Sequence, residues 1–338
     1  MCRPDREFDS LSVVLRSLTP LWTGGVDRAC DRLRETGLLG SLRWWYEVVV
    51  RGLGGSACDP TREGRCEYNP KSKLPPQQQM CPACHLFGCT GWARKFRLQV
   101  LDDRGQPRQT AIGEDDRFTL RFVVLRRIPH EERTLLNLTL RLIAEYGVLG
   151  GRTVFKPSDE SSRAHGMHHR DFGLVQIVDA PEVYKDREQM REYLARQNWR
   201  RVDHDDFAWA SLQNFWCLKG RYLARVGPDT STFNKVLGRR QSKAVKEKRG
   251  RRVIRYSDFL EEERDDASRW LAGQVQESKK VFSFKAGGGV TFGFVKPGLV
   301  EFDQVKERLR SIWPDFEDSE FLTGDRILGR LLPGGGRA

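Results

Sequence analysis

The stretch that most constrains the fold of this chain is segment 56–92, which is rich in cysteine and poor in residues that build a core. Pro, Gln, Gly and Lys are frequent between its cysteines. A segment this polar needs another source of folding energy, and metal binding can supply it. Its cysteines are Cys58, Cys66, Cys81, Cys84 and Cys89.

The cysteine spacing favours one tetrahedral zinc site with a structural role. Cys81 and Cys84 are separated by two residues, a spacing that lets both thiolates bind one ion. Cys58 and Cys66 would supply the other two ligands, and Cys89 is a rival for any one position. Free thiols or a redox pair stay open as alternatives, although this CxxC lacks the strand context of a thioredoxin-like motif.

The charge balance favours a polyanionic partner. The chain has 58 Lys and Arg residues against 46 Asp and Glu, a formal net charge of +12. We place nucleic acid ahead of an anionic membrane, and a merely soluble basic protein remains the alternative. The sequence contains neither an apolar run of membrane-spanning length nor a signal peptide, so we expect a cytoplasmic protein without a disulfide framework.

The stretch 41–51 has the periodicity of an amphipathic helix, with Ser41 as its expected N-cap. Gly40, Ser41 and Arg43 at the helix start would form a phosphate seat. Trp44 could either pack or stack on a base. The alternative is a buried helix with a solvated charged face. The apolar side would comprise Leu42, Trp45, Tyr46, Val49 and Val50.

The remaining periodicities of the first half predict an α+β, ferredoxin-like unit with segment 56–92 inserted. A strong helix is expected over residues 131–146. The expected strands cover residues 9–18, 95–101, 117–125 and 172–178. The second half repeats this style less clearly, with helices expected at 187–199 and 303–313 and strands at 214–224, 281–284 and 290–295.

The most basic stretch is the loop 235–255, which contains Arg239 and Arg240. Clustered cations of this kind track phosphates and give sequence-independent affinity for nucleic acid. A solvated disordered loop is the alternative for its middle, and the two interpretations are compatible. Lys219 and Arg221 on the strand-like stretch would extend the basic surface.

Half of the six histidines lie in one polar loop, as His165, His168 and His169. They could bind a metal, act as general acid or base in RNA cleavage, or lie near a phosphate backbone. No carboxylate or lysine spacing completes a catalytic set, so we favour a flexible contact loop.

Several motifs resemble a known family. Residues 18–25 resemble the opening strand and turn of the RAMP proteins of CRISPR systems. Residues 40–46 resemble the signature of the first-subunit family of the Cmr (type III-B) effector complex, and residues 81–89 are similar to its cysteine and Leu-Phe-Gly segment. Residues 279–284 and 291–298 fit its C-terminal portion.

The resemblance implies two tandem ferredoxin-like folds, which we assign to residues 1–180 and 181–338. It implies an RNA-binding structural subunit that caps the crRNA 3′ end, contacts target RNA and lies beside other Cmr subunits in antiviral defence. The expected RNA-binding residues are Gly40, Ser41, Arg43, Trp44, Trp45, Lys219, Arg221, Arg239 and Arg240.

The resemblance implies no catalytic residue in this chain. Related backbone RAMPs cut RNA with a loop aspartate, and Asp27 and Asp31 occupy that general region. Neither lies in a Gly-rich loop that matches the cleaving subunits, so we do not transfer the activity. The alternative is an endoribonuclease that uses Asp27 or Asp31 to bind a divalent metal, or His165, His168 or His169 as acid or base.

Overall fold

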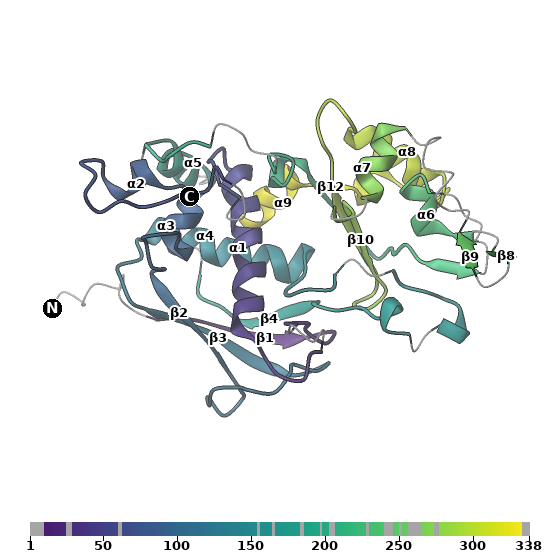
Figure 1. Cartoon of the computed structure of the whole chain (residues 1–338), viewed down its shortest axis with the longest axis horizontal. Helices are drawn as coiled ribbons and strands as arrows, with labels where there is room; N and C mark the ends of the chain where they lie inside the picture. Colours follow the sequence, from purple (N-terminus) through teal and green to yellow (C-terminus); the bar gives the residue numbers. More distant parts are fainter. Residues whose placement is uncertain are drawn as a thin grey trace. The chain divides into compact units, whose positions relative to one another are not determined.

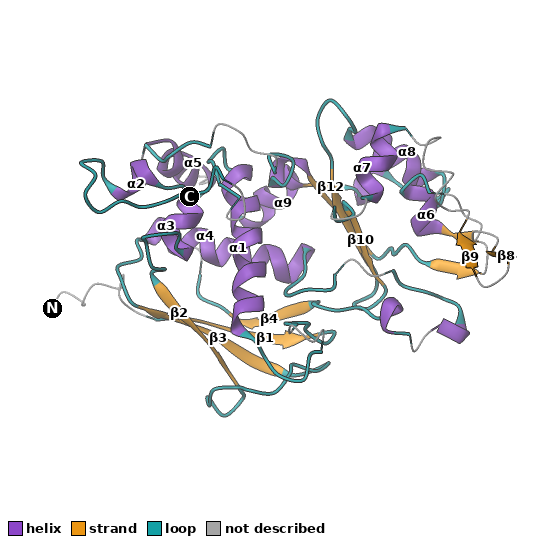
Figure 2. Ribbon diagram, in the orientation of Figure 1, coloured by secondary structure: helices purple, strands orange, loops and turns teal. Residues whose placement is uncertain are grey.

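Two four-stranded sheets, each packed against helices, form the framework of the chain (Figures 1 and 2). The computed structural model describes residues 10–24, 29–59, 63–153, 156–163, 166–182, 186–196, 198–202, 207–227, 230–239, 246–249, 252–255, 265–273 and 277–332.

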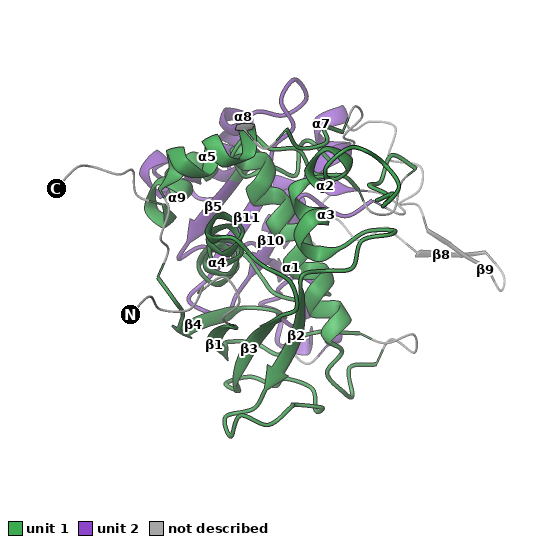
Figure 3. Cartoon of the chain, turned by 90° about the vertical axis from the view of Figure 1, so that its left-hand side faces the viewer, with its two compact units in different colours: residues 1–152, 172–215, 323–338 green, residues 153–171, 216–322 purple. Residues whose placement is uncertain are grey.

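The chain divides into two compact units, coloured separately in Figure 3. Unit 1 comprises residues 1–152, 172–215 and 323–338, and unit 2 comprises residues 153–171 and 216–322. Both units are discontinuous in sequence. The expected division of the chain at residue 180 stays a prediction.

Unit 1 has the strand and helix order of a ferredoxin-like fold, as predicted. Helices α1 (Glu35–Gly52) and α4 (His130–Tyr146) cover one face of its sheet (Figure 1). Its strand pairs are antiparallel, and the sheet order is β2-β3-β1-β4. The four strands are β1 (Leu11–Ser17), β2 (Phe96–Leu101), β3 (Arg117–Val124) and β4 (Val175–Asp179).

The cysteine-rich insertion lies between α1 and β2, where the sequence places it. It contains two short helices, α2 (Pro76–Gln79) and α3 (Pro82–Phe87). Unit 1 is completed by α5 (Arg187–Arg196), the 3-10 helix η4 (Leu212–Asn214) and α9 (Gly324–Leu331).

Unit 2 repeats the same order of strands and helices, so it is a second ferredoxin-like fold. Its sheet order is β10-β11-β5-β12, which matches that of unit 1 strand for strand. The strands are β5 (Phe215–Lys219), β10 (Val281–Phe284), β11 (Val290–Phe294) and β12 (Leu322–Thr323). The helices are α6 (Thr232–Val236), α7 (Asp266–Ala272) and α8 (Phe302–Arg310).

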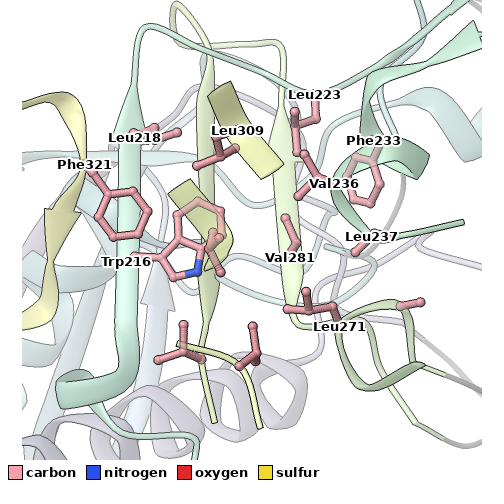
Figure 4. Packing of buried hydrophobic residues seen from close by; sticks show 14 of the residues in the cluster. Trp216, Leu218, Leu223, Phe233, Val236, Leu237, Leu271, Val281, Leu309 and Phe321 are labelled. Atoms are coloured by element: carbon pink, nitrogen blue, oxygen red, sulfur yellow. The ribbon is translucent and has the colours of Figure 1, made fainter. Parts of the chain in front are cut away.

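The core of unit 2 lies between its sheet and its helices (Figure 4). Trp216 stacks on Phe321 with ring centroids 5.4 Å apart. Phe233, Val281 and Leu309 contribute to the same buried cluster from α6, β10 and α8. This packing fixes α6 and its side chains against the sheet.

The smaller elements lie mainly in the connections of unit 2. They are the 3-10 helices η2 (Ser161–Arg163), η3 (Met167–His169) and η6 (Asp318–Glu320), and two strand pairs. The first pair is β6 (Arg225–Gly227) with β7 (Thr230–Ser231). The second is β8 (Lys246–Arg249) with β9 (Arg252–Arg255), inside the expected basic loop. No helix in the described ranges is long and apolar enough to cross a membrane.

The expected start of the first helix at Ser41 is wrong. Helix α1 begins at Glu35, so Ser41 lies inside it, and the Ser41 hydroxyl accepts a hydrogen bond from the Gly150 amide at 3.0 Å. Gly37 lies in the first turn of α1 and is closely packed. A Cβ atom at Gly37 would lie only 2.6 Å from the carbonyl oxygen of Thr23.

Two glycines of α1 should therefore respond oppositely to alanine. Gly37→Ala should lower the free energy of unfolding by about 1–3 kcal/mol, because the new methyl group overpacks against the Thr23 backbone. Gly40→Ala should raise it by up to about 1 kcal/mol, because position 40 is helical and nothing lies within 4 Å of its Cβ. Urea denaturation followed by circular dichroism measures both. Equal effects of the two substitutions would contradict the helix start at Glu35.

Candidate metal centre and nucleic-acid contacts

Four buried cysteines of the insertion converge on one point. The sulfur atoms of Cys58, Cys66, Cys81 and Cys84 all lie within 4.8 Å of one another. The Sγ atom of Cys58 is 3.4 Å from that of Cys84 and 3.9 Å from that of Cys81. Tetrahedral zinc with bonds of 2.3 Å would place its sulfur ligands about 3.8 Å apart. This group could hold a metal ion.

The local sequence explains how the second cysteine pair is positioned. Pro82 occupies the first turn of α3, where its missing amide hydrogen is not needed, and Cys81 is the N-cap. Cys84 follows in the same helix, one turn from Cys81. The Cys81 amide donates to the Cys66 sulfur at 3.3 Å, which ties the helix start to the preceding loop.

The four thiol groups interact with one another through hydrogen bonds. Hydrogen bonds from the neighbouring thiols, that of Cys66 first, lower the pKa of Cys58. Hydrogen bonding to Cys58 is the main cause that raises the pKa values of Cys66, Cys81 and Cys84. The thiolate form is thus favoured most at Cys58. A divalent ion in place of these protons would allow all four groups to be thiolates.

Two arginines donate hydrogen bonds to the sulfur atoms. The Arg43 Nη2 atom donates to the Cys84 sulfur at 3.1 Å, and the Arg200 Nη1 atom donates to the Cys66 sulfur at 3.2 Å. Four thiolates around a divalent ion carry a net charge of −2. The two guanidinium groups can offset this charge, because each is positively charged and donates a hydrogen bond to a ligand sulfur.

The remaining contacts of Arg43 also point into unit 1. Its Nη1 atom donates to the carbonyl oxygen of Gly88 at 2.8 Å, and its Nε atom donates to Glu47 Oε1 at 2.9 Å. Arg43 therefore joins α1 to the end of α3. Because α1 begins at Glu35, the amides of Gly40 and Ser41 lie within the helix, and the expected open helix end at these residues is wrong. An RNA contact of Gly40, Ser41 and Arg43 stays a prediction.

The two tryptophans of α1 differ in exposure. Trp45 is 2% exposed, and its indole nitrogen donates to the carbonyl oxygen of Val148 at 2.8 Å. Trp44 is half-buried and packs edge-on against Trp45, with ring centroids 4.9 Å apart. Trp45 is thus a packing residue of unit 1. Base stacking on Trp44 stays a prediction.

The predicted basic residues of unit 2 have different surroundings. Lys219 is exposed at the end of β5. Arg221 forms ion pairs of 3.0 Å with both Asp315 and Glu320, which raise its pKa. Arg239 donates to the carbonyl oxygen of Ala272. RNA contacts of these residues stay predictions, and Arg240 lies outside the described residues.

The candidate catalytic residues do not assemble into a described site. Asp31 and His168 are exposed, and His169 Nδ1 lies 2.9 Å from the carbonyl oxygen of Lys156. Within the described ranges, the four cysteines are the only group of His, Cys, Asp and Glu residues that could hold a metal ion. Cys89 is not a member of that group. Asp27 and His165 lie outside the described residues.

Sequence reasoning missed a buried ion cluster beside the cysteines. Glu132 accepts hydrogen bonds from the Lys95 ammonium group at 2.8 and 2.9 Å, and its Oε1 atom lies 2.5 Å from His85 Nδ1. Burial lowers the pKa of Lys95, and Glu132 opposes that shift. The cluster fastens α3 to α4. Lys95, Glu132 and His85 belong to no sequence motif of recognisable spacing, so they could not be identified from the sequence. Arg200 could not be identified for the same reason.

One family model matches the chain. It is described as the RAMP superfamily and matches residues 14–155, which include part of β1 and all of α1, the insertion, β2, β3 and α4. A search of curated proteins finds no match.

Solved structures with a similar chain include subunits of CRISPR complexes. Cmr1 from Pyrococcus furiosus in its apo form is 10% identical with a TM-score of 0.41, and the match covers 96% of this chain and 97% of that chain. A chain of the type III-B Cmr-beta structure bound to cognate target RNA is 11% identical with a TM-score of 0.43, covering 90% and 99%. At these values, neither likeness assigns a role or a partner to this chain.

Metal analysis tests the cysteine group. The purified chain should contain about one equivalent of a divalent metal, and Cys81→Ser should lose it because one of four ligands is removed. Cys217→Ser, which alters a buried cysteine of unit 2, is the control and should keep the metal. Elemental analysis by mass spectrometry measures the content. A folded wild-type chain without metal would refute the centre.

The two arginines can be tested through metal affinity. Arg43→Gln and Arg200→Gln should each weaken metal binding by about 10–100-fold, because each removes a charged donor to a ligand sulfur. Competition with a coloured chelator gives the affinity. Arg16→Gln removes an exposed arginine paired with Asp115 and should leave the affinity unchanged. Wild-type affinity in both sulfur-contacting variants would show that the arginines do not support the centre.

Proposed function

We propose that the protein is an RNA-binding structural subunit of a type III-B (Cmr) CRISPR ribonucleoprotein, because the RAMP superfamily model matches residues 14–155 of the chain. In this proposal it caps the crRNA 3′ end and supports target RNA capture in antiviral defence. Its protein partners are the backbone subunits and the neighbouring capping RAMP. The family match carries the proposal, and the motif resemblances at residues 40–46, 279–284 and 291–298 extend it over most of the chain.

The charge of the chain supports an RNA ligand. The formal net charge is +12, and the strands β8 and β9 lie in the basic loop 235–255. Such cations release counterions from a phosphate backbone when they bind it. The repeated ferredoxin-like units provide two sheets on which such contacts can be built.

We propose zinc as the ion of the cysteine centre. Four buried thiolates with near-tetrahedral spacing suit zinc, and a site closed by four protein ligands has a structural role. In the cytoplasm, where we place the protein, thiols remain reduced. Zinc would hold the insertion to α1 and α3.

We propose no catalytic role for the chain. The endoribonuclease alternative needs Asp27 or Asp31 with a metal ion, or a histidine of residues 165–169. Nothing among the described residues favours it specifically, because only the four cysteines form a potential metal group there.

An RNA assay separates binding from cleavage. The pure chain, incubated with labelled crRNA and complementary target RNA with and without magnesium, should bind RNA and leave it intact. Binding should weaken as salt rises, with a slope of log affinity against log salt of about −0.7 for each phosphate contact to single-stranded RNA. Gel analysis detects products. Products that disappear in Asp31→Ala or His168→Ala would overturn the structural role.

A further inference from the structure

The sheet of unit 1 has one face that its helices leave open. Helices α1 and α4 lie on the other face, and no described helix of unit 1 lies on this one (Figures 1 and 3). Successive side chains of a strand point to opposite faces, and the burial of β1, β2 and β3 alternates accordingly. We define the open face by the outward residues of these three strands. They are Ser12, Val14, Arg16, Arg97, Gln99, Leu101, Arg117, Thr119, Arg121 and Val123.

The charged residues of the open face all have the same sign. They are Arg16, Arg97, Arg117 and Arg121, and all four are exposed. Carboxylates lie at the borders of the face. Asp115, in the turn before β3, pairs with Arg16 at 2.8 Å, and Asp179 ends β4, the edge strand farthest from β2. The middle of the face is therefore positively charged.

Three of these arginines have no counter-charge in the part of the chain that the structure describes. The guanidinium groups of Arg97, Arg117 and Arg121 form no ion pair with a described residue. Arg108, in the connection between β2 and β3, differs from them because it pairs with Asp116 at 2.5 Å. The three unpaired guanidinium groups are thus available to an anionic ligand.

The strand register places the arginines beside one another. Arg16 and Arg117 are directly opposite in the β1–β3 pair, an arrangement that lowers the stability of a sheet because like charges repel. Arg97 and Arg121 are diagonal neighbours on β2 and β3, about 7–8 Å apart. Arg117 and Arg121 are separated by about 13 Å along β3. The charges thus extend over three adjacent strands, which suits a ligand with several anionic groups.

The composition of the open face favours RNA over a protein as this ligand. Interfaces between proteins usually have an apolar or aromatic centre and place their charged residues at the rim. Here Arg117 and Arg121 belong to β3, which is an inner strand of the sheet. None of the outward residues of β1, β2 and β3 is aromatic, so bases would have no ring on which to stack. The face is therefore suited to phosphates and not to bases.

We propose that the open face of unit 1 binds the phosphate backbone of single-stranded RNA, with Arg97, Arg117 and Arg121 each contacting a phosphate. This inference rests on the proposed RNA-binding function and adds a surface separate from α1 and from the basic loop 235–255. Guanidinium groups can bind two phosphate oxygens at once. Because such contacts do not involve the bases, binding at this face is independent of sequence.

Salt-dependent binding of a labelled oligouridylate tests the open face in the full chain. Arg97→Gln, Arg117→Gln and Arg121→Gln should each weaken binding and reduce the magnitude of the salt slope by about 0.7, the effect of one lost phosphate contact. The triple variant should reduce it by about 2. Arg121→Lys retains the charge and should keep the wild-type slope. Arg191→Gln is the matched control, because Arg191 is an exposed arginine of α5 that forms no ion pair with a described residue.

The outcomes separate this surface from the proposed function. Wild-type affinity and slope in the triple variant would overturn RNA as the ligand of the open face and favour an acidic protein, while RNA binding by the protein stands. An equal loss in Arg191→Gln would also overturn it, because binding would then depend on net charge alone. A wild-type chain that binds no oligouridylate would overturn the proposed function and this inference together.

Thermal unfolding shows that a loss of binding is not a loss of folding. The three substituted side chains are exposed, so the variants should melt at the wild-type temperature or above it. An increase is expected for Arg117→Gln, because it removes the repulsion between Arg117 and Arg16.

Discussion

The hydrogen bonds of Arg43 join the two parts of unit 1 that differ most in composition. Burial would lower the pKa of Arg43, but Cys84 and Glu47 raise it above its usual range, so the charge is retained inside the fold. The guanidinium group links the apolar helix α1 to the polar insertion through Cys84 and the Gly88 carbonyl oxygen. Without such links, segment 56–92 has little apolar surface with which to pack.

The two ferredoxin-like units share one topology and carry different chemistry. Unit 1 has the cysteine insertion between its first helix and second strand. In unit 2, the corresponding connection begins with α6 and holds the basic strands β8 and β9. The same arrangement of strands with different connections thus carries a potential metal-binding group in unit 1 and a basic segment in unit 2.

Much of this structure could be predicted from local patterns. The alternation of apolar and polar residues predicted β1 and β3, and the rows of leucine predicted α4. The cysteine spacing predicted the four converging thiols. The start of α1 at Glu35 could not be predicted, because the Gly-Ser pair at residues 40 and 41 resembles a helix start and the close packing of Gly37 against Thr23 is a tertiary contact. Arg200 and the ion cluster of Glu132 depend on tertiary contacts. Strand β12 has two residues and therefore no periodicity.

We propose that four cysteines and one metal ion hold the insertion to α1. X-ray absorption spectroscopy of the purified chain at the zinc edge tests it directly. Four sulfur scatterers at about 2.3 Å from the metal are predicted, the shell of a closed tetrahedral thiolate site. A shell of nitrogen and oxygen scatterers, or fewer than four sulfurs, would contradict it.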